Sequence, residues 1–156
     1  ARIKAAAVSR HVPLPETHAI LACDTVGEIE GLILGKPYDT HDARRMIEAL
    51  SGEKHRVFTG VSIWFPEALG TTDANEGPHR YTTIEGCISS EVFMESLNRK
   101  EIDSYMATNE WCGKAGACGF QDGILPLRLL KGSADTVVGL PVALIEQMIR
   151  RHLEAP

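Results

Sequence analysis

Apolar and polar positions in the first quarter of the chain predict a helix, a strand and a hairpin. Residues 1–8 (ARIKAAAV) have a helix-forming composition. Residues 19–23 (AILAC) are a short apolar run typical of a buried strand, and the run ends at Asp24. Residues 26–35 alternate loosely around a Glu-Gly pair, which predicts a β-hairpin whose second strand is LILG. We therefore expect Asp24 at the carboxyl end of a buried strand.

A helix is predicted next, because apolar residues recur at three- and four-residue steps: Ala43, Met46, Ile47 and Leu50. Asp39 or Thr40 can cap its first turn, and a Ser-Gly pair at 51–52 ends it. The Gly-Lys-Pro sequence just before this helix stops the preceding strand, because proline cannot continue the hydrogen-bond ladder.

The middle of the chain predicts extended structure around a loop. Residues 55–65 alternate well enough to form a strand. Residues 66–79 contain Gly, Asp and Asn without periodicity, which indicates a surface loop. A second extended pair is expected over 80–94.

The last third predicts a helix, a loop, a strand and a final helix. Asn98 and Glu101 approximate a capping box, and Ile102, Tyr105 and Met106 share one face of the helix that follows. Residues 113–123 hold four glycines in eleven positions and predict an irregular loop. A strand is expected at 124–130 and a helix at 137–153, with a proline in its first turn.

Strands and helices therefore alternate along the chain, which predicts an α/β domain with a mixed central sheet flanked by helices. The chain has 156 residues, of which 44% are hydrophobic, and this fits one domain over 1–156. No linker, internal repeat or low-complexity stretch divides it.

Composition and charge exclude some classes of function. The net charge is -5 and the isoelectric point is near 5.7, so the chain has no general basic field for DNA or RNA. No apolar stretch approaches the ~20 residues of a membrane helix, and nothing at the start resembles a signal peptide. We expect a soluble, cytoplasmic protein that binds neither nucleic acid nor membrane.

Cysteine and histidine spacing gives no metal motif. The four cysteines contain no C-x-x-C pair, so reduced thiols are expected. The six histidines show no H-x-x-x-H or H-E-x-x-H spacing and are interpreted as surface residues.

The residues that could carry chemistry are one acid and several cations. Asp24 follows a buried strand, where open α/β sheets place ligand-binding groups, but it could also cap a turn or pair with a surface lysine. Lys36, between Gly and Pro, could bind phosphate or lie in a solvated turn. Lys114 and Gln121 lie in the glycine-rich loop, which lacks the G-x-x-x-x-G-K-[ST] order of a Walker A loop. Together with Lys4, these lysines could converge with Asp24 on a phosphate-rich ligand.

Several motifs in order resemble the Maf family, also called septum-formation or Maf-like proteins. The matching blocks are KAAAV at 4–8, CDTV at 23–26, GLILGKPYD at 31–39, ARRMIEALSGEKHRVFTGVSI at 43–63, EIDSYM at 101–106, KAGACGFQ at 114–121 and VVGLP at 137–141. The combination of D-T-x-V, G-K-P, L-S-G-x-x-H-x-V-x-T-G-V and K-A-G-x-x-G-x-Q is highly specific. The resemblance covers nearly the whole chain.

The resemblance implies an elongated, two-lobed, inosine-triphosphatase-like fold with a central cleft. It also implies a homodimer, a divalent cation (Mg²⁺ or Mn²⁺), and cleavage of the α–β phosphoanhydride of a nucleoside triphosphate. By motif, Asp24 resembles the catalytic proton acceptor and a metal contact, and Lys4, Lys36 and Lys114 resemble phosphate-side residues. Thr25 and Gln121 match positions linked to nucleobase choice, and the pattern is similar to the branch that acts on dTTP and UTP.

Two departures from the family pattern stand out. The family normally begins with an S-x-S-x-R-R loop and a helix before the first block matched here, so we expect this sequence to be part of a longer chain. Cys118 stands where a tyrosine is common, and it is interpreted as a small filler rather than a reactive thiol.

Other functions fit the same motifs. A nucleotide-binding regulator of cell division would bind triphosphate with little hydrolysis. A pyrophosphatase for 7-methyl-GTP, ITP or XTP would keep the reaction and change the base. The residue types suit this reaction independently of the resemblance, because hydrolysis of a polyanion needs a carboxylate to deprotonate water and cations to neutralise the phosphates.

Overall fold

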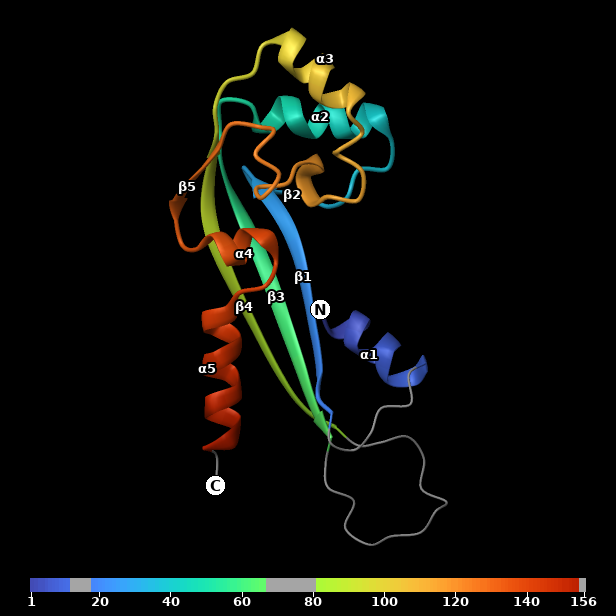
Figure 1. The fold of residues 1–156 in the computed structure, drawn as a ribbon, viewed down its shortest axis with the longest axis vertical. Helices are drawn as coiled ribbons and strands as arrows, with labels where there is room; N and C mark the ends of the chain where they lie inside the picture. The colour runs from blue at the N-terminus through green and yellow to red at the C-terminus, as the bar shows by residue number, and fades with distance from the viewer. Residues whose placement is uncertain (12–17, 67–80, 155–156) are drawn as a thin grey trace, which may run out of the picture. The chain divides into compact units, whose positions relative to one another are not determined.

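The computed structural model describes residues 1–11, 18–66 and 81–154. The helices and strands appear in Figure 1 and are, in chain order, α1 (Arg2–His11), β1 (Ile20–Ile29), β2 (Leu32–Leu34), α2 (Thr40–Leu50), β3 (Lys54–Pro66), β4 (Tyr81–Met94), α3 (Arg99–Ala107), the 3₁₀ turn η1 (Ala115–Ala117), β5 (Leu127–Lys131), α4 (Ala134–Val138) and α5 (Val142–Leu153). The predicted loop at 66–79 lies almost wholly outside the described residues.

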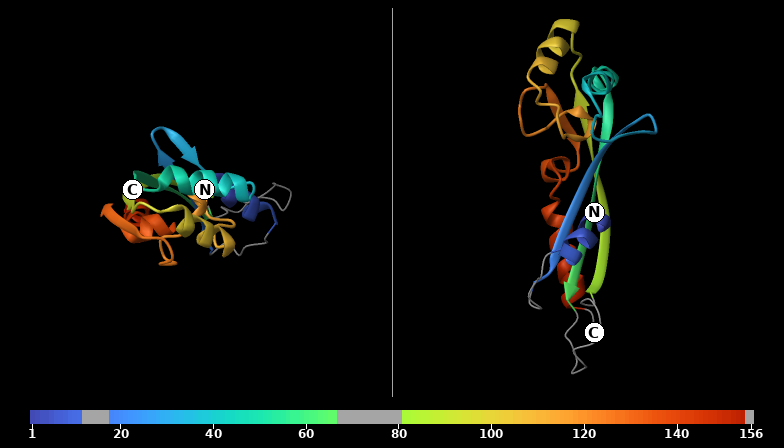
Figure 2. Two further views of the ribbon diagram at one scale, coloured as in Figure 1. Left: turned by 90° about the horizontal axis from the view of Figure 1, so that it is seen from above. Right: turned by 90° about the vertical axis from the view of Figure 1, so that its right-hand side faces the viewer.

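The α/β class expected from the sequence is confirmed. Five strands form one sheet in the order β2-β1-β3-β4-β5. The sheet is antiparallel and not mixed, because α2 and α3 do not serve as crossovers between parallel neighbours. At one edge, β1 and β2 form the predicted hairpin, drawn in blue in Figure 2. Within it, Glu28 pairs with Ile33. The turn residues Glu30 and Gly31 have φ values of 50° and 85°, as a tight two-residue hairpin turn requires.

Strand β1 corrects the position expected for Asp24. The strand runs without a break from Ile20 to Ile29, so Asp24 is its fifth residue and not its end. The apolar run stops at Asp24, but the strand continues. An exposed polar side chain can occupy a strand position without interrupting the hydrogen-bond ladder.

Strand β4 corrects a second expectation. Residues 81–94 form one strand of 14 residues and not an extended pair. Gly86 lies inside this strand and serves packing, because a Cβ there would lie 2.9 Å from Sδ of Met148 on helix α5. The missing side chain lets the helix approach the strand closely.

The two predicted caps are confirmed. Asp39 caps α2 by accepting a hydrogen bond from the Asp42 amide at 2.8 Å. Asn98 and Glu101 form a complete capping box at the start of α3, since each side chain accepts from the other residue's amide. The buried faces are those predicted: Ala43, Met46, Ile47 and Leu50 on α2, and Ile102, Tyr105 and Met106 on α3.

The C-terminal helix is divided in two. A single helix over 137–153 is predicted, whereas α4 ends at Val138 and α5 begins at Val142. Gly139, at φ 104°, forms the left-handed C-cap of α4 and donates to the carbonyl of Asp135 at 3.0 Å. Glycine tolerates this conformation, so the chain can turn between the two helices.

The chain divides into two compact units. Unit 1 comprises 1–24, 60–87 and 143–156, and unit 2 comprises 25–59 and 88–142. Unit 1 has two small apolar clusters, one around Ala5, Ile20 and Ala22 and one around Val61, Ile63 and Ile145. Unit 2 has a larger core, in which Leu34, Ile47, Leu50 and Met94 are fully or almost fully buried.

The cysteine expectation is confirmed, and the histidine expectation is wrong at one position. Cys23, Cys87, Cys112 and Cys118 are free thiols. His55 is only 5% exposed, and burial lowers its pKa. It alternates with exposed neighbours along β3, so the polar surroundings in the sequence conceal an inward-facing position. Within the described ranges, no helix is long and apolar enough to cross a membrane.

Candidate active site

The acid at the centre of the sequence analysis forms an ion pair with the first candidate lysine. Nζ of Lys4, on helix α1, lies 2.5 Å from Oδ1 of Asp24, on strand β1, within unit 1. Both side chains are about half exposed, at 56% and 48%. The pair is therefore in contact and also open to solvent, as a group that activates water must be.

The backbone beside Asp24 fixes this pair. Nζ of Lys4 also donates to the carbonyl oxygen of Cys23 at 3.2 Å, so the lysine binds two successive residues of β1. The Cys23 side chain packs in an apolar cluster of unit 1. Burial raises the pKa of its thiol, although the nearby Lys4 ammonium partly opposes this. Cys23 is thus a packing residue, and Asp24 is the ionisable group of this segment that faces solvent.

The Gly-Lys-Pro corner and the glycine-rich loop meet inside unit 2. The amide of Gly116 donates to the carbonyl oxygen of Gly35 at 2.9 Å. Gly116 has φ 65°, and a Cβ there would lie 3.6 Å from Cδ1 of Leu50 in the core. This hydrogen bond places the backbone of Lys36 one residue from the contact and that of Lys114 two residues from it. The structure therefore brings these two sequence-predicted segments together.

The two lysines differ in their surroundings. Lys36 is exposed, and among the residues that the structure describes its ammonium has no hydrogen-bond or ion-pair partner. Lys114 is paired with two carboxylates, those of Glu110 at 2.9 Å and Asp122. Desolvation alone would lower the pKa of Lys114, but the hydrogen bonds to Asp122 and Glu110 outweigh it and raise the pKa. A substrate phosphate would have to compete with both carboxylates for Lys114.

A hydrogen bond from helix α3 holds another part of the glycine-rich loop. The Tyr105 hydroxyl donates to the carbonyl oxygen of Ala117 at 2.8 Å, and desolvation raises the pKa of this hydroxyl. Ala117 has φ 59°, unusual for a residue with a side chain. Gln121 lies on the exposed part of the loop. The loop thus presents one exposed amide side chain from a backbone that α3 holds in place.

Cys118 behaves as a filler. Burial raises its pKa to about 12, with the Lys114 cation opposing the shift and the Asp122 carboxylate adding to it. Thiolates, not thiols, attack electrophiles, so this cysteine is inert at neutral pH.

We expect iodoacetamide at pH 8 to modify Cys87 and Cys112, which are exposed, and to leave Cys118 largely unmodified. Peptide mass spectrometry of the folded protein measures the three sites in one sample, and the same experiment in denaturant shows that each is chemically competent. Fast labelling of Cys118 in the folded protein would contradict the filler interpretation.

Thr25 lies in a hydroxyl network that the sequence analysis missed. Its Oγ1 is 2.9 Å from Oγ1 of Thr59, which is fully buried on β3 and donates to the carbonyl oxygen of Thr136 at 2.7 Å. Gly139 is close by, since a Cβ there would lie 2.8 Å from Oγ1 of Thr25. Thr59 lies in the T-G-V block and Gly139 in the VVGLP block, but nothing in either block indicates that they meet.

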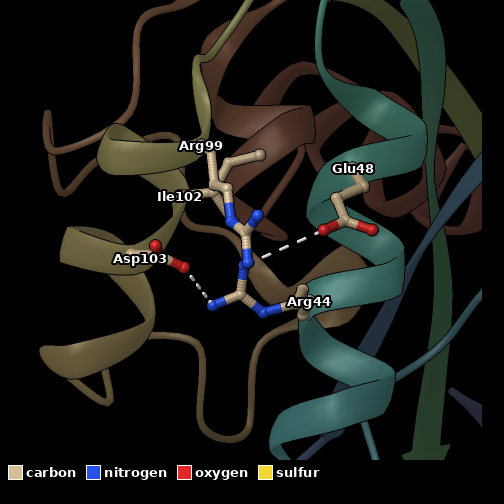
Figure 3. A pocket seen from close by; sticks show the side chains of 5 residues that line it. All are labelled: Arg44, Glu48, Arg99, Ile102 and Asp103. Atoms are coloured by element: carbon tan, nitrogen blue, oxygen red, sulfur yellow. Dashed lines mark hydrogen bonds and ion pairs between the residues drawn. The ribbon is translucent and has the colours of Figure 1, made fainter.

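A hollow on the surface of α2 and α3 contains none of the predicted site residues. Its lining is Arg44, Glu48, Arg99, Ile102 and Asp103. Figure 3 shows Arg44 reaching from α2 to Asp103 on α3, a distance of 2.5 Å, and toward Glu48, at 3.8 Å. The Arg99 side chain points into the same hollow (Figure 3). The Arg44–Asp103 pair joins the two helices and the Arg44–Glu48 pair lies within α2, so the hollow is interpreted as part of the scaffold.

The donor chemistry fits a divalent cation that arrives with a substrate. No group of three or more His, Cys, Asp or Glu side chains in the described residues could hold a metal by itself. Mg²⁺ commonly binds through one or two carboxylates together with substrate phosphates and water, and the half-exposed Asp24 offers one such carboxylate.

Comparison with known proteins decides the family. Residues 1–152 match the family model described as Maf-like protein. The chain belongs to this family. It is 39% identical over 153 residues to a protein of Anaeromyxobacter dehalogenans named dTTP/UTP pyrophosphatase, a match that covers 97% of this chain and 70% of that protein.

Two further relatives carry the same name. The protein of Agathobacter rectalis is 37% identical over 138 residues, which are 88% of this chain and 63% of that protein. The protein of Pyrococcus furiosus is 35% identical over 147 residues, which are 94% of this chain and 70% of that protein. The Maf-like chain thus spans 63–70% of the length of these three relatives.

The candidate residues fall into two groups. Asp24 and Lys4 belong to unit 1 and form one pair, and Thr25, Lys36, Lys114 and Gln121 belong to unit 2. Their convergence on one triphosphate stays a prediction.

Proposed function

We propose that this Maf-like chain carries the catalytic residues of a nucleoside triphosphate pyrophosphatase that cleaves the α–β phosphoanhydride of dTTP or UTP. The observation that carries the proposal is the half-exposed Asp24–Lys4 ion pair in a chain whose relatives are named dTTP/UTP pyrophosphatases. The names of the relatives support the reaction, and the Asp24–Lys4 pair supports Asp24 as the general base.

In the proposed reaction Asp24 accepts a proton from water. The water oxygen forms a bond to the α-phosphorus, the bond between that phosphorus and the bridging oxygen breaks, and pyrophosphate leaves with the electron pair. The products are a nucleoside monophosphate and pyrophosphate. Lys4 orients the Asp24 carboxylate through their 2.5 Å contact. Of the three candidate lysines, Lys36 can neutralise phosphate charge without first leaving a partner among the described residues.

A divalent cation would complete the charge neutralisation. When bound, Mg²⁺ or Mn²⁺ supplies Lewis-acid stabilisation of phosphate oxygens, and Asp24 is the residue proposed to hold it. Gln121 is proposed to contact the base, because its exposed amide offers both a donor and an acceptor to the edge of a pyrimidine.

The test is a substrate panel with the intact protein. The folded protein is incubated with dTTP, UTP, CTP, 7-methyl-GTP, ITP and XTP in the presence of Mg²⁺ or Mn²⁺, and pyrophosphate release is followed. We expect fastest release from dTTP and UTP. Tight nucleotide binding by calorimetry without release from any of the six would instead indicate a binding regulator. The family resemblance also supports a homodimer, which sedimentation equilibrium of the same sample tests.

Removal of the Lys36 charge should weaken substrate binding. For Lys36→Gln we expect KM for UTP to rise roughly ten- to a hundredfold, because one charge-assisted phosphate contact of about 1.5–3 kcal/mol is lost. The matched control is Lys100→Gln, an exposed lysine on α3, which should keep KM within about twofold. Equal effects of the two substitutions would remove Lys36 from the phosphate-binding role.

A further inference from the structure

The residue after Asp24 belongs to a chain of hydroxyl groups within unit 2. Thr25 Oγ1 on β1 is 2.9 Å from Thr59 Oγ1 on β3, which is 2.7 Å from the carbonyl oxygen of Thr136 on α4. Thr59 and Thr136 are both fully buried. Two hydrogen bonds thus connect two strands of the sheet and a helix that follows 77 residues after Thr59.

The direction of both hydrogen bonds can be assigned. A carbonyl oxygen only accepts, so Thr59 donates its single hydroxyl proton to Thr136. The proton in the Thr25–Thr59 contact must therefore come from Thr25. Thr25 has no proton left to donate to a substrate.

Gly139, the residue after α4, packs closely against the Thr25 hydroxyl. Its φ is 104°, and a Cβ at this position would lie 2.8 Å from Oγ1 of Thr25. Both the backbone conformation and the close approach require glycine. The turn after α4 therefore lies directly against Thr25, which limits the movement of β1 at this point.

Thr25 also faces away from the Asp24 carboxylate. Successive side chains of a strand point to opposite faces of the sheet, and both residues lie inside the continuous strand β1. The hydroxyl chain thus holds β1 on the face of the sheet opposite to the one on which Asp24 presents its carboxylate.

We propose that Thr25, Thr59 and Gly139 are positioning residues, which form a latch that holds β1 and so fixes the neighbouring Asp24 for proton abstraction. This inference rests on the proposed function of Asp24. It replaces the nucleobase contact that the family resemblance implies for Thr25 with a role in orienting the catalytic base.

The test compares four substitutions by steady-state kinetics at a temperature where every variant is folded. Thr59→Val keeps the shape and removes the hydroxyl, and Thr59→Ser keeps the hydroxyl. The matched control is Thr108→Val, which removes a hydroxyl that also donates to a carbonyl oxygen at 2.7 Å, that of Tyr105. We expect Thr59→Val to lower kcat for UTP about tenfold, because small displacements of a catalytic group are costly.

The same variant should leave KM and the order of preference among UTP, CTP and GTP unchanged, and Thr59→Ser should restore most of kcat. Gly139→Ala, which places a methyl group against Thr25, should lower kcat in the same way. A changed base preference in Thr59→Val would show that Thr25 contacts the base and would overturn the proposal. An unchanged kcat in Thr59→Val would also overturn it.

Amide hydrogen exchange separates this proposal from the proposed function. In the nucleotide-free protein, Thr59→Val should lose protection over residues 23–27 of β1, and Thr59→Ser should keep it. Unchanged exchange in Thr59→Val would overturn the latch whether or not the protein is active. Absence of pyrophosphate release from the unsubstituted protein would overturn the proposed function and the role in proton abstraction, while exchange would still decide whether the latch exists.

Discussion

Asp24→Asn is expected to lower kcat for dTTP and UTP by roughly 10²–10⁴-fold, the contribution of a general base. The substitution keeps the size of the side chain and removes the charge that attracts a water proton. Lys4 loses its 2.5 Å ion-pair partner but keeps its hydrogen bond to the Cys23 carbonyl, so the local backbone should persist. Stopped assays of pyrophosphate release measure kcat, and calorimetry with a non-hydrolysable UTP analogue measures binding.

The control for this experiment is Asp103→Asn, which removes another exposed, ion-paired aspartate, on α3. It should leave kcat within about twofold, since surface ion pairs away from a site contribute little. Turnover by Asp24→Asn at the rate of the unsubstituted protein would exclude Asp24 as the base. Loss of both turnover and folding, detected by circular dichroism, would instead show that the ion pair is structural.

Ile47→Ala is expected to reduce the free energy of unfolding by about 2–5 kcal/mol. Ile47 lies on α2 and has no exposed surface, and it packs in the core of unit 2 with Leu34 and Leu50. Removing its side chain both withdraws buried apolar area and leaves a cavity among neighbours that can only partly relax. Urea unfolding followed by circular dichroism at constant pH measures the change.

The matched control is Ile33→Ala on β2, where the isoleucine is 60% exposed. This substitution should change stability by only about 0.5 kcal/mol, because little apolar surface is withdrawn from water in the native state. A similar loss for both variants would contradict the packing of α2 against the core. Since Leu50 contacts the site where Gly116 meets Gly35, the core also supports the Lys36 and Lys114 segments.

Local patterns account for most elements of the fold. The capping box of Asn98 and Glu101 and the cap at Asp39 are formed by residues three positions apart, so the sequence contains all the information needed. The hairpin at Glu30 and Gly31 is equally local. These features were predicted correctly because their energetics depend on neighbours along the chain.

The predictions that were wrong share a different cause. Asp24 was expected at the end of a strand because an apolar run stops there, and residues 80–94 were expected to form an extended pair. In the structure β1 continues past Asp24, and Gly86 makes room for Met148. A polar residue or a glycine in a strand can reflect exposure or close packing, and only a distant partner shows which applies.

The sequence by itself determined the family of this Maf-like chain, its α/β class and the segments that hold Asp24, Lys4, Lys36, Lys114 and Gln121, because ordered motifs and short-range periodicity are properties of the chain. Only the tertiary structure decided that Asp24 pairs with Lys4 and that the Gly116 amide donates to the Gly35 carbonyl oxygen. It alone also decided that the Thr25 hydroxyl is hydrogen-bonded to Thr59 and lies against Gly139. These contacts join residues that are far apart in sequence, and they form only after folding has brought the elements together.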